Sequence, residues 1–83
     1  MHMLEQKEGF VMGSPTRKRI VILLAGQKSP VESRTLSKLG HIVEPVCKRT
    51  LEELTEKGLV AHGEGGYALT EEGLAVHVKL LST

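Results

Sequence analysis

The apolar residues of this chain come in short groups, and glycine or proline stands between one group and the next. Ser14 and Pro15 precede the first group, as an N-cap serine and a first-turn proline typically precede a helix. The apolar stripe that follows comprises Ile20, Leu23 and Leu24. We therefore expect a helix over residues 15–25, ended by Gly26. A strand is the alternative, because the run IVILLA is continuously apolar.

The next segment allows two interpretations of where a second helix begins. The stretch SPVE, residues 29–32, has the spacing of a capping box, which makes Ser29 the N-cap. Alternatively, Val31 is buried in an extended stretch and Ser33 is the N-cap. In both interpretations Gly40 ends the helix, and its inner face consists of Leu36 and Leu39.

A short turn over residues 40–43 leads into a third helix, which begins at Glu44 and Pro45. Its expected buried face has the spacing i, i+4 and i+7 and comprises Cys47, Leu51 and Leu54. Lys57 and Gly58 are typical of a helix end, where a cation in the last turn precedes a glycine in the left-handed conformation.

Two short strands and a last helix follow. Residues 59–62 and 67–69 are the expected strands, and the glycine-rich stretch GEGG between them can supply the positive φ angles of a hairpin turn. Thr70 is the expected N-cap of the last helix, with two glutamates in its first turn. The expected apolar stripe of this helix comprises Leu74, Val78 and Leu81.

This order predicts an α+β, mostly helical domain over residues 14–83, in which three helices and a hairpin close one small core and a C-terminal helix completes the domain. Residues 1–13 show no clear pattern, and we expect an arm or a disordered segment there. The chain has one cysteine, Cys47, which excludes an internal disulfide and fits a cytoplasmic setting. Its longest apolar run, residues 20–25, is too short to span a membrane.

Motifs for catalysis or cofactor binding are incomplete in this chain. The stretch AGQKS, residues 25–29, contains only the Lys-Ser of a phosphate-binding loop. The four histidines are scattered, and short paired spacings of metal ligands are missing. We therefore expect no metal, no cofactor and no enzymatic activity.

Charge is distributed unevenly along the chain. Residues 15–49 contain eight Lys and Arg against two Glu, which gives +6, whereas residues 50–83 carry −4. Such an asymmetry indicates a polyanionic partner, although solvated helices can also carry these charges.

Two stretches carry a resemblance to a known family. LEELTEKGLV, residues 51–60, and YALTEEG, residues 67–73, resemble the end of the recognition helix and the wing of winged helix-turn-helix proteins, especially small archaeal and bacterial transcriptional regulators. The resemblance covers roughly residues 15–81. It implies a sequence-specific protein that binds double-stranded DNA, with residues 44–57 in the major groove, and a homodimer.

The resemblance also implies roles for individual residues. The candidates for base recognition are Glu44, Pro45, Val46, Lys48 and Arg49. The candidates for phosphate contacts are Arg17, Lys18, Arg19, Arg34 and Lys38. The wing comprises His62, Gly63, Glu64, Gly65 and Gly66. Since the wing has no Lys or Arg and the third helix ends in an acidic patch, the alternative is a winged-helix module for protein–protein interaction without DNA binding.

Overall fold

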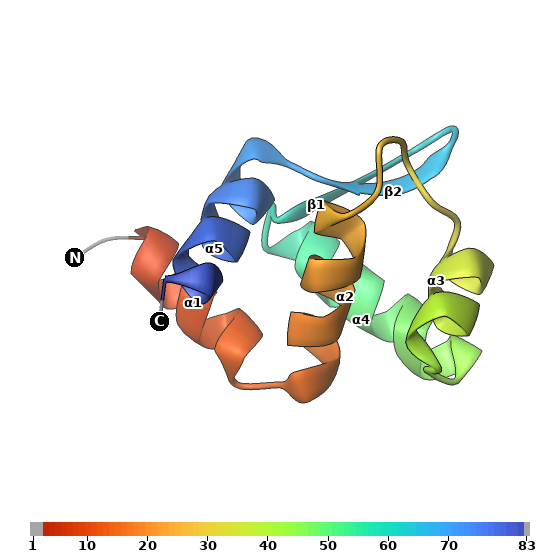
Figure 1. Ribbon diagram of the computed structural model, residues 1–83, viewed down its shortest axis with the longest axis horizontal. Helices are drawn as coiled ribbons and strands as arrows, with labels where there is room; N and C mark the ends of the chain where they lie inside the picture. The colour runs from red at the N-terminus through yellow and green to blue at the C-terminus, as the bar shows by residue number, and fades with distance from the viewer. Residues whose placement is uncertain (1–2, 83) are drawn as a thin grey trace.

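The computed structural model describes residues 3–82 of the chain. It is α+β and mostly helical, and its two strands form an antiparallel hairpin (Figure 1). This arrangement is compatible with a winged helix. Its elements are α1 (Met3–Met12), α2 (Pro15–Ala25), α3 (Ser33–Gly40), α4 (Glu44–Glu56), β1 (Val60–Gly63), β2 (Gly66–Leu69) and α5 (Glu71–Leu81). None of the helices in this range is long and apolar enough to cross a membrane.

The first predicted helix is confirmed as α2, and the strand alternative is wrong. The Ser14 hydroxyl accepts a hydrogen bond from the Arg17 backbone N–H at 3.3 Å, and Pro15 occupies the first turn. The buried side chains of α2 are Ile20, Val21 and Leu24. Leu23, which the sequence places in the stripe, is only partly buried and lies against α3 near Gly40.

The extended interpretation of residues 29–33 is confirmed for the buried Val31 but wrong for the N-cap, which is Glu32 and not Ser33, and the capping box is wrong. Val31 pairs with Tyr67: its N–H donates to the Tyr67 carbonyl at 2.9 Å, and the Tyr67 N–H donates to the Val31 carbonyl at 2.7 Å. Glu32 is then the N-cap of α3, without a side-chain hydrogen bond, and Ser33 is the first helical residue. Short α3 therefore starts from a third extended segment beside the hairpin.

The predicted inner face of α3 is half correct. Leu36 is fully buried, but Leu39 is 50% exposed. The closest approach of α3 to α2 is at Gly40, where an added Cβ would lie 2.8 Å from the Leu23 Cδ1. Because the backbone itself makes this contact, Leu39 points away from the core.

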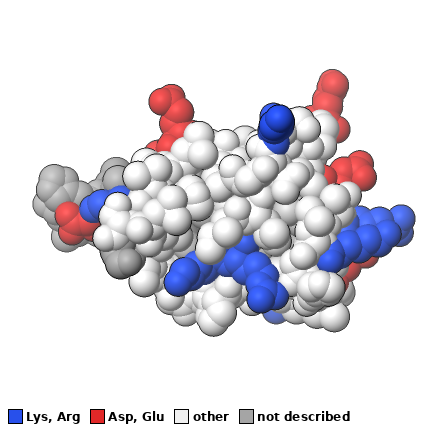
Figure 2. Space-filling model, in the orientation of Figure 1, with Lys and Arg blue, Asp and Glu red and all other residues white. Residues whose placement is uncertain are grey.

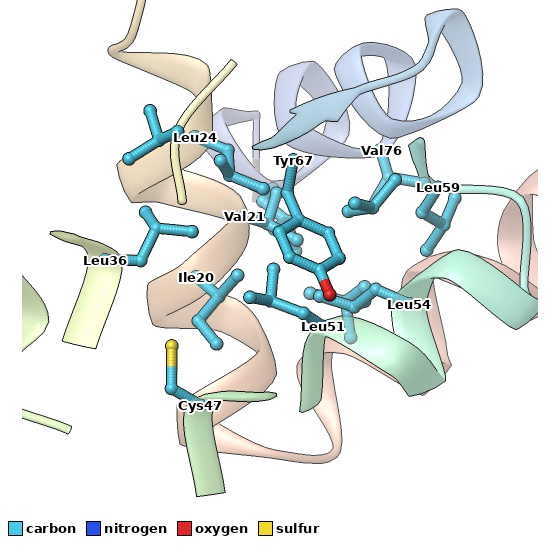
Figure 3. Close-up of a cluster of buried hydrophobic side chains, with 14 residues drawn as sticks. Ile20, Val21, Leu24, Leu36, Cys47, Leu51, Leu54, Leu59, Tyr67 and Val76 are labelled. Atoms are coloured by element: carbon cyan, nitrogen blue, oxygen red, sulfur yellow. The ribbon is translucent and has the colours of Figure 1, made fainter. Parts of the chain in front are cut away.

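Helix α4 supplies the predicted core face. Cys47, Leu51 and Leu54 are fully buried. Gly58 follows the helix with φ +77°, as expected for a glycine at a helix end. In Figure 3 the Tyr67 ring lies among side chains of α2, α4 and α5, so the hairpin closes the core from one side.

The hairpin is confirmed, but the first strand is shifted by one residue and the second begins one residue earlier than predicted, at Gly66. Gly63 pairs with Gly66, and Val60 pairs with Leu69. Of the three glycines at and beside the turn, Gly63, Gly65 and Gly66, only Gly66 has a positive φ, +120°. A Cβ at Gly66 would lie 2.4 Å from the Val31 carbonyl carbon, so this glycine is required for the close approach of the two segments.

Both ends of the hairpin meet at Thr70. Its hydroxyl donates to the Gly58 carbonyl at 2.6 Å and accepts from the Gly73 N–H at 3.1 Å, which confirms Thr70 as the N-cap of α5. Its N–H also donates to the Leu59 carbonyl at 3.0 Å. The residues just before β1 are thereby tied to the start of α5.

The predicted buried stripe of α5 is wrong. Leu74, Val78 and Leu81 are 48%, 58% and 71% exposed, whereas the buried residues are Gly73, Val76 and Leu80. A Cβ at position 73 would lie 2.1 Å from the Leu59 carbonyl oxygen. The backbone of α5 therefore touches the base of the hairpin at Gly73, and this contact fixes the rotation of the helix.

The N-terminal segment is a helix packed on the domain, which corrects the expected arm or disordered segment. Helix α1 lies against α5 and α2 (Figure 1), and Val11 is fully buried. Lys7 forms an ion pair with Glu72 of α5, with Nζ and Oε2 2.6 Å apart. The domain thus includes residues 3–13. Residues 1, 2 and 83 of the predicted ranges lie outside the described part of the chain.

Candidate functional site

The outward face of α4 carries most of the residues that sequence reasoning assigned to base recognition. Glu44, Pro45, Lys48 and Arg49 are exposed, and Val46 is half-buried. Lys48 and Arg49 point outward because the buried Cys47 and Leu51 lie on the other side of the same turns. Within residues 3–82 neither cation forms an ion pair. Both are therefore available to an external partner.

The cations of α4 lie in the first two turns, and its unpaired carboxylates lie mainly in the last two. Glu52 and Glu56 are exposed. Glu53 is 39% exposed, and its carboxylate is paired with Arg17. The helix therefore changes from basic to acidic along its outward face after Arg49, although Glu44 adds a negative charge at its start.

Two open hollows lie between α4 and the hairpin. The larger, of about 620 Å³, is lined by Lys48, Arg49, Glu52, Glu53, Thr55, Glu56, His62 and Tyr67. The second, of about 410 Å³, extends to α3, and its charged lining residues are Glu32, Arg34, Glu44, Lys48 and Glu64. Lys48 lines both hollows, and the second one brings it together with Arg34.

His62 and Tyr67 form an aromatic pair that sequence reasoning missed. Their rings are stacked, with centroids 4.0 Å apart and an angle of 5° between the planes. They are directly opposed in the hairpin register, which is the signal that could have predicted the contact. Burial, with smaller effects of Glu52 and Cys47, raises the pKa of the Tyr67 phenol.

Cys47 lies beneath this face as a core residue. It is fully buried, and its thiol donates a hydrogen bond to the Ser33 carbonyl, with 3.6 Å between sulfur and oxygen. Burial, assisted by the Glu44 carboxylate, raises the pKa of the Cys47 thiol. Both effects disfavour the thiolate, so the arrangement does not activate Cys47 as a nucleophile.

The residues predicted to contact phosphates do not form one surface. Arg34 borders α4 through the hollow it shares with Lys48, and Lys38 is exposed on the same helix. Arg19 donates from Nη1 to the Gly40 carbonyl at 2.7 Å and lines a third hollow with Val46. Figure 2 shows basic side chains at the α3 end of the molecule and along the lower edge over α2.

Arg17 and Lys18 are placed elsewhere. The Arg17 Nε lies 3.3 Å from the Glu53 Oε1, and its Nη1 donates to the Phe10 carbonyl at 3.0 Å. Its guanidinium also lies 3.8 Å from the centre of the Phe10 ring. Arg17 thus joins α1, α2 and α4 inside the domain. Lys18 lines a hollow on α2 that includes no residue of α4 or the hairpin.

The predicted wing residues differ in their surroundings. His62, Gly63, Glu64 and Gly65 are exposed, whereas Gly66 is buried against Val31. The tip of the hairpin therefore consists of residues 62–65, and its only carboxylate is that of Glu64.

No group of three His, Cys, Asp or Glu side chains suited to a metal ion occurs within residues 3–82. No protein-family model and no curated protein matches this chain.

Proposed function

We propose that this chain is a winged-helix protein that binds double-stranded DNA, as a cytoplasmic transcriptional regulator. Helix α4 enters the major groove with its first two turns, and the hairpin lies along the adjacent backbone. The observation that carries the proposal is the pair of exposed, unpaired cations Lys48 and Arg49 on the outward face of α4. Arg49 is suited to a bidentate contact with guanine.

The distribution of charge along α4 supports a partial insertion. The helix has 13 residues and is therefore about 20 Å long, of which a groove-reading helix uses mainly the N-terminal part. The cations at positions 48 and 49 fall within this part, and the glutamates at positions 52 and 56 fall beyond it. Phosphate contacts come from Arg34 and Lys38 on α3, with Arg19 as a further contact near the start of α4.

A second function is supported by a different observation. Glutamates outnumber Lys and Arg around both hollows between α4 and the hairpin, by three to two in each. A surface with charges of both signs and an exposed His62 ring stacked on the buried Tyr67 suits a protein partner better than a uniform polyanion. In this alternative the same hollows hold a segment of a partner protein, without DNA.

A salt titration separates the two functions. We expect fluorescence anisotropy with a nonspecific DNA duplex to show binding that weakens as salt rises. If Arg19, Arg34, Lys38, Lys48 and Arg49 each neutralise one phosphate of the nonspecific duplex, the logarithm of the binding constant falls with the logarithm of the salt concentration with a slope of about −4 to −5. Absent or salt-insensitive binding rejects the DNA proposal and favours the protein-binding alternative.

A double variant locates the interface. Replacing Lys48 and Arg49 by alanine should weaken binding about tenfold or more and make the salt slope less steep by about 2. The matched control is Lys18→Ala, which removes an exposed cation from the hollow on α2 and should leave the slope unchanged. Equal losses in both variants would place the DNA on α2 instead.

A further inference from the structure

Helix α2 exposes an apolar side chain between two cations. Ile22 is 46% exposed on the outward face of the helix. It follows Arg19 by three positions and Lys18 by four, and Pro15 precedes the same two cations by four and three positions. Residues at these spacings are neighbours on a helix surface, so apolar and basic side chains alternate on the exposed face of α2.

These four residues line a hollow together with Leu23. Its volume is about 370 Å³. A second hollow, of about 450 Å³, shares Pro15 and Arg19 with the first and extends to the turn between α3 and α4, where it is lined by Ile42 and the exposed Val43. The two hollows therefore form one continuous surface of apolar and basic residues.

The positive charge of this surface is not balanced by the domain itself. Within the described part of the chain no carboxylate lines either hollow. Residues 15–31 contain four Lys and Arg and no acidic residue, and neither Lys18 nor Arg19 forms an ion pair within residues 3–82. On the face shown in Figure 2, the basic side chains over the lower part of α2 have no acidic side chain beside them.

The place of the two cations along α2 adds to this imbalance. Lys18 and Arg19 lie in the N-terminal half of the helix, near the positive end of its dipole, and the first turn contains no acidic residue. Cations are slightly unfavourable at this end of a helix, whereas carboxylates are favourable there. A partner that brings carboxylates to this face would therefore interact favourably with both the side chains and the helix.

We propose that this face of α2 docks an acidic amphipathic helix of a partner protein. Apolar side chains of that helix fill the hollow beside Ile22, and carboxylates on either side of them pair with Lys18 and Arg19. The partner thus supplies an apolar cover and negative charge, which the domain does not provide for this face.

The shape and chemistry of the surface favour a protein helix over other anionic partners. A DNA backbone carries charge but offers no apolar side chain for a hollow lined by Ile22 and Leu23. A membrane surface is bound by apolar side chains that project into it, whereas the apolar residues here line a hollow. An amphipathic helix presents a row of projecting apolar side chains, which fits a hollow.

This inference goes beyond the proposed function and does not depend on it. Lys18 and Ile22 are not among the proposed DNA contacts, although Arg19 borders both surfaces. One helix face and one hollow make a small interface, so we expect a dissociation constant of about 10–100 µM.

The probe for the test is a synthetic, fluorescently labelled peptide of about 15 residues, long enough for a helix. It has leucine at positions i, i+3, i+4 and i+7 and glutamate at the flanking positions. Fluorescence anisotropy with the full chain, without DNA, should show binding in the expected range. The same peptide with lysine in place of glutamate should bind at least about tenfold more weakly, and so should a peptide with serine in place of leucine.

Two variants of the chain locate the site. Lys18→Glu should weaken binding of the glutamate peptide about tenfold and strengthen binding of the lysine peptide. Ile22→Ser should weaken binding of both peptides about five- to tenfold, because apolar contact area is lost.

The matched controls are Lys28→Glu and Val78→Ser. They change an exposed cation outside the two hollows and an apolar residue on α5 that is 58% exposed. Both should bind the glutamate peptide as the wild type does. Circular dichroism of all four variants checks that the fold is retained.

Several results would overturn the proposal. One is the absence of binding of the glutamate peptide at about 1 mM chain, and another is equal affinity for the glutamate and lysine peptides. Equal losses in Lys18→Glu and Lys28→Glu would show general charge attraction without a site on α2. Amide chemical-shift changes confined to the hollows between α4 and the hairpin would place the peptide there instead.

Sedimentation with phosphatidylglycerol vesicles covers the membrane as an alternative partner. We expect no co-sedimentation that depends on Ile22. Co-sedimentation of the wild type that is lost in Ile22→Ser, without binding of the glutamate peptide, would replace the protein partner by a lipid surface and so overturn the proposal.

Discussion

The exposed faces of α4 and α5 differ in how well they can be predicted from the sequence. Helix α4 has one apolar stripe, and the structure buries it, so its charged face is exposed as predicted. Helix α5 has two apolar stripes, one with Leu74, Val78 and Leu81 and one with Val76 and Leu80. The structure buries the shorter one. Periodicity therefore fixes the orientation of a helix only when one stripe is available.

A backbone contact determines which of the two apolar stripes of α5 is buried. Gly73 lies on the side of Val76 and Leu80, and it allows α5 to approach the Leu59 carbonyl. Alanine or a larger residue at this position would push the helix away. The comparison therefore predicts that a single methyl group at position 73 disturbs α5, although the helix propensity of alanine is higher than that of glycine.

The largest effect is expected for Gly73→Ala. Its Cβ would lie 2.1 Å from the Leu59 oxygen, a backbone atom that cannot move freely. We expect the free energy of unfolding to fall by about 3 kcal/mol or more, comparable to severe overpacking. Urea denaturation monitored by circular dichroism gives this value.

Gly9→Ala is the matched control, because Gly9 is also a helical glycine but a Cβ there would have no neighbour within 4 Å. Helix propensity predicts a gain of about 0.5–1 kcal/mol for this variant. If both variants were stabilised equally, the contact at Gly73 would not determine the orientation of α5.

A smaller effect is expected for Arg17→Met. This variant tests whether Arg17 stabilises the fold or takes part in DNA binding with the α4 face. Arg17 contacts Phe10 and Glu53, and its side chain is 25% exposed. After allowance for screening by solvent, losing the cation–π contact and the hydrogen bonds should cost about 1–2 kcal/mol of stability. DNA affinity should not change, because the guanidinium faces inward.

Lys18→Met serves for comparison, since Lys18 neighbours Arg17 but is exposed and makes no ion pair within the described residues. It should change stability by less than about 0.5 kcal/mol. A loss of DNA affinity in Arg17→Met at unchanged stability would indicate that Arg17 contacts the DNA after all.

The smallest effect is expected from pH and concerns the core below the α4 face. Burial raises the pKa of both Cys47 and Tyr67, so the folded state holds these protons more tightly than the unfolded state. Their contribution to stability is complete below the ordinary pKa values of a thiol and a phenol, and it is lost as pH rises through the raised values. The melting temperature should therefore fall as pH rises above about 8.5, the ordinary pKa of a thiol, and fall further above about 10, the ordinary pKa of a phenol.

Replacing Cys47 by alanine removes one of the two groups and should reduce this alkaline loss, although stability at neutral pH also falls through the lost packing. An unchanged slope of melting temperature against pH in this variant would show that Cys47 does not contribute to the loss.

Local signals account for what the sequence predicted well. Ser14, Pro15 and Thr70 fix helix starts through contacts within a few residues, and their capping roles are confirmed. The hairpin follows from its glycines and the short strands around them. These features depend on neighbours in the chain, which a single sequence displays directly.

Contacts between distant segments account for what was missed. Helix α1 is held by Val11 in the core and by Lys7 paired with Glu72, and neither contact leaves a pattern in residues 1–13. Similarly, Arg17 looked like a surface cation because Glu53 lies 36 residues away along the chain. At the candidate site, the exposure of Lys48 and Arg49 was foreseeable from helix periodicity, but the stacking of His62 on Tyr67 required the hairpin register.

Three of the hydrogen bonds of Thr70, those to Gly58, Leu59 and Gly73, have a mechanical consequence. They join the end of the α4 segment, the base of the hairpin and the first turn of α5 through one residue. The hairpin therefore cannot swing as an independent flap about its base. A load applied at residues 62–65 must either bend the short turn itself or pull on α5. Replacing Thr70 by valine would remove the two hydroxyl bonds and weaken this connection, while the backbone bond to Leu59 remains.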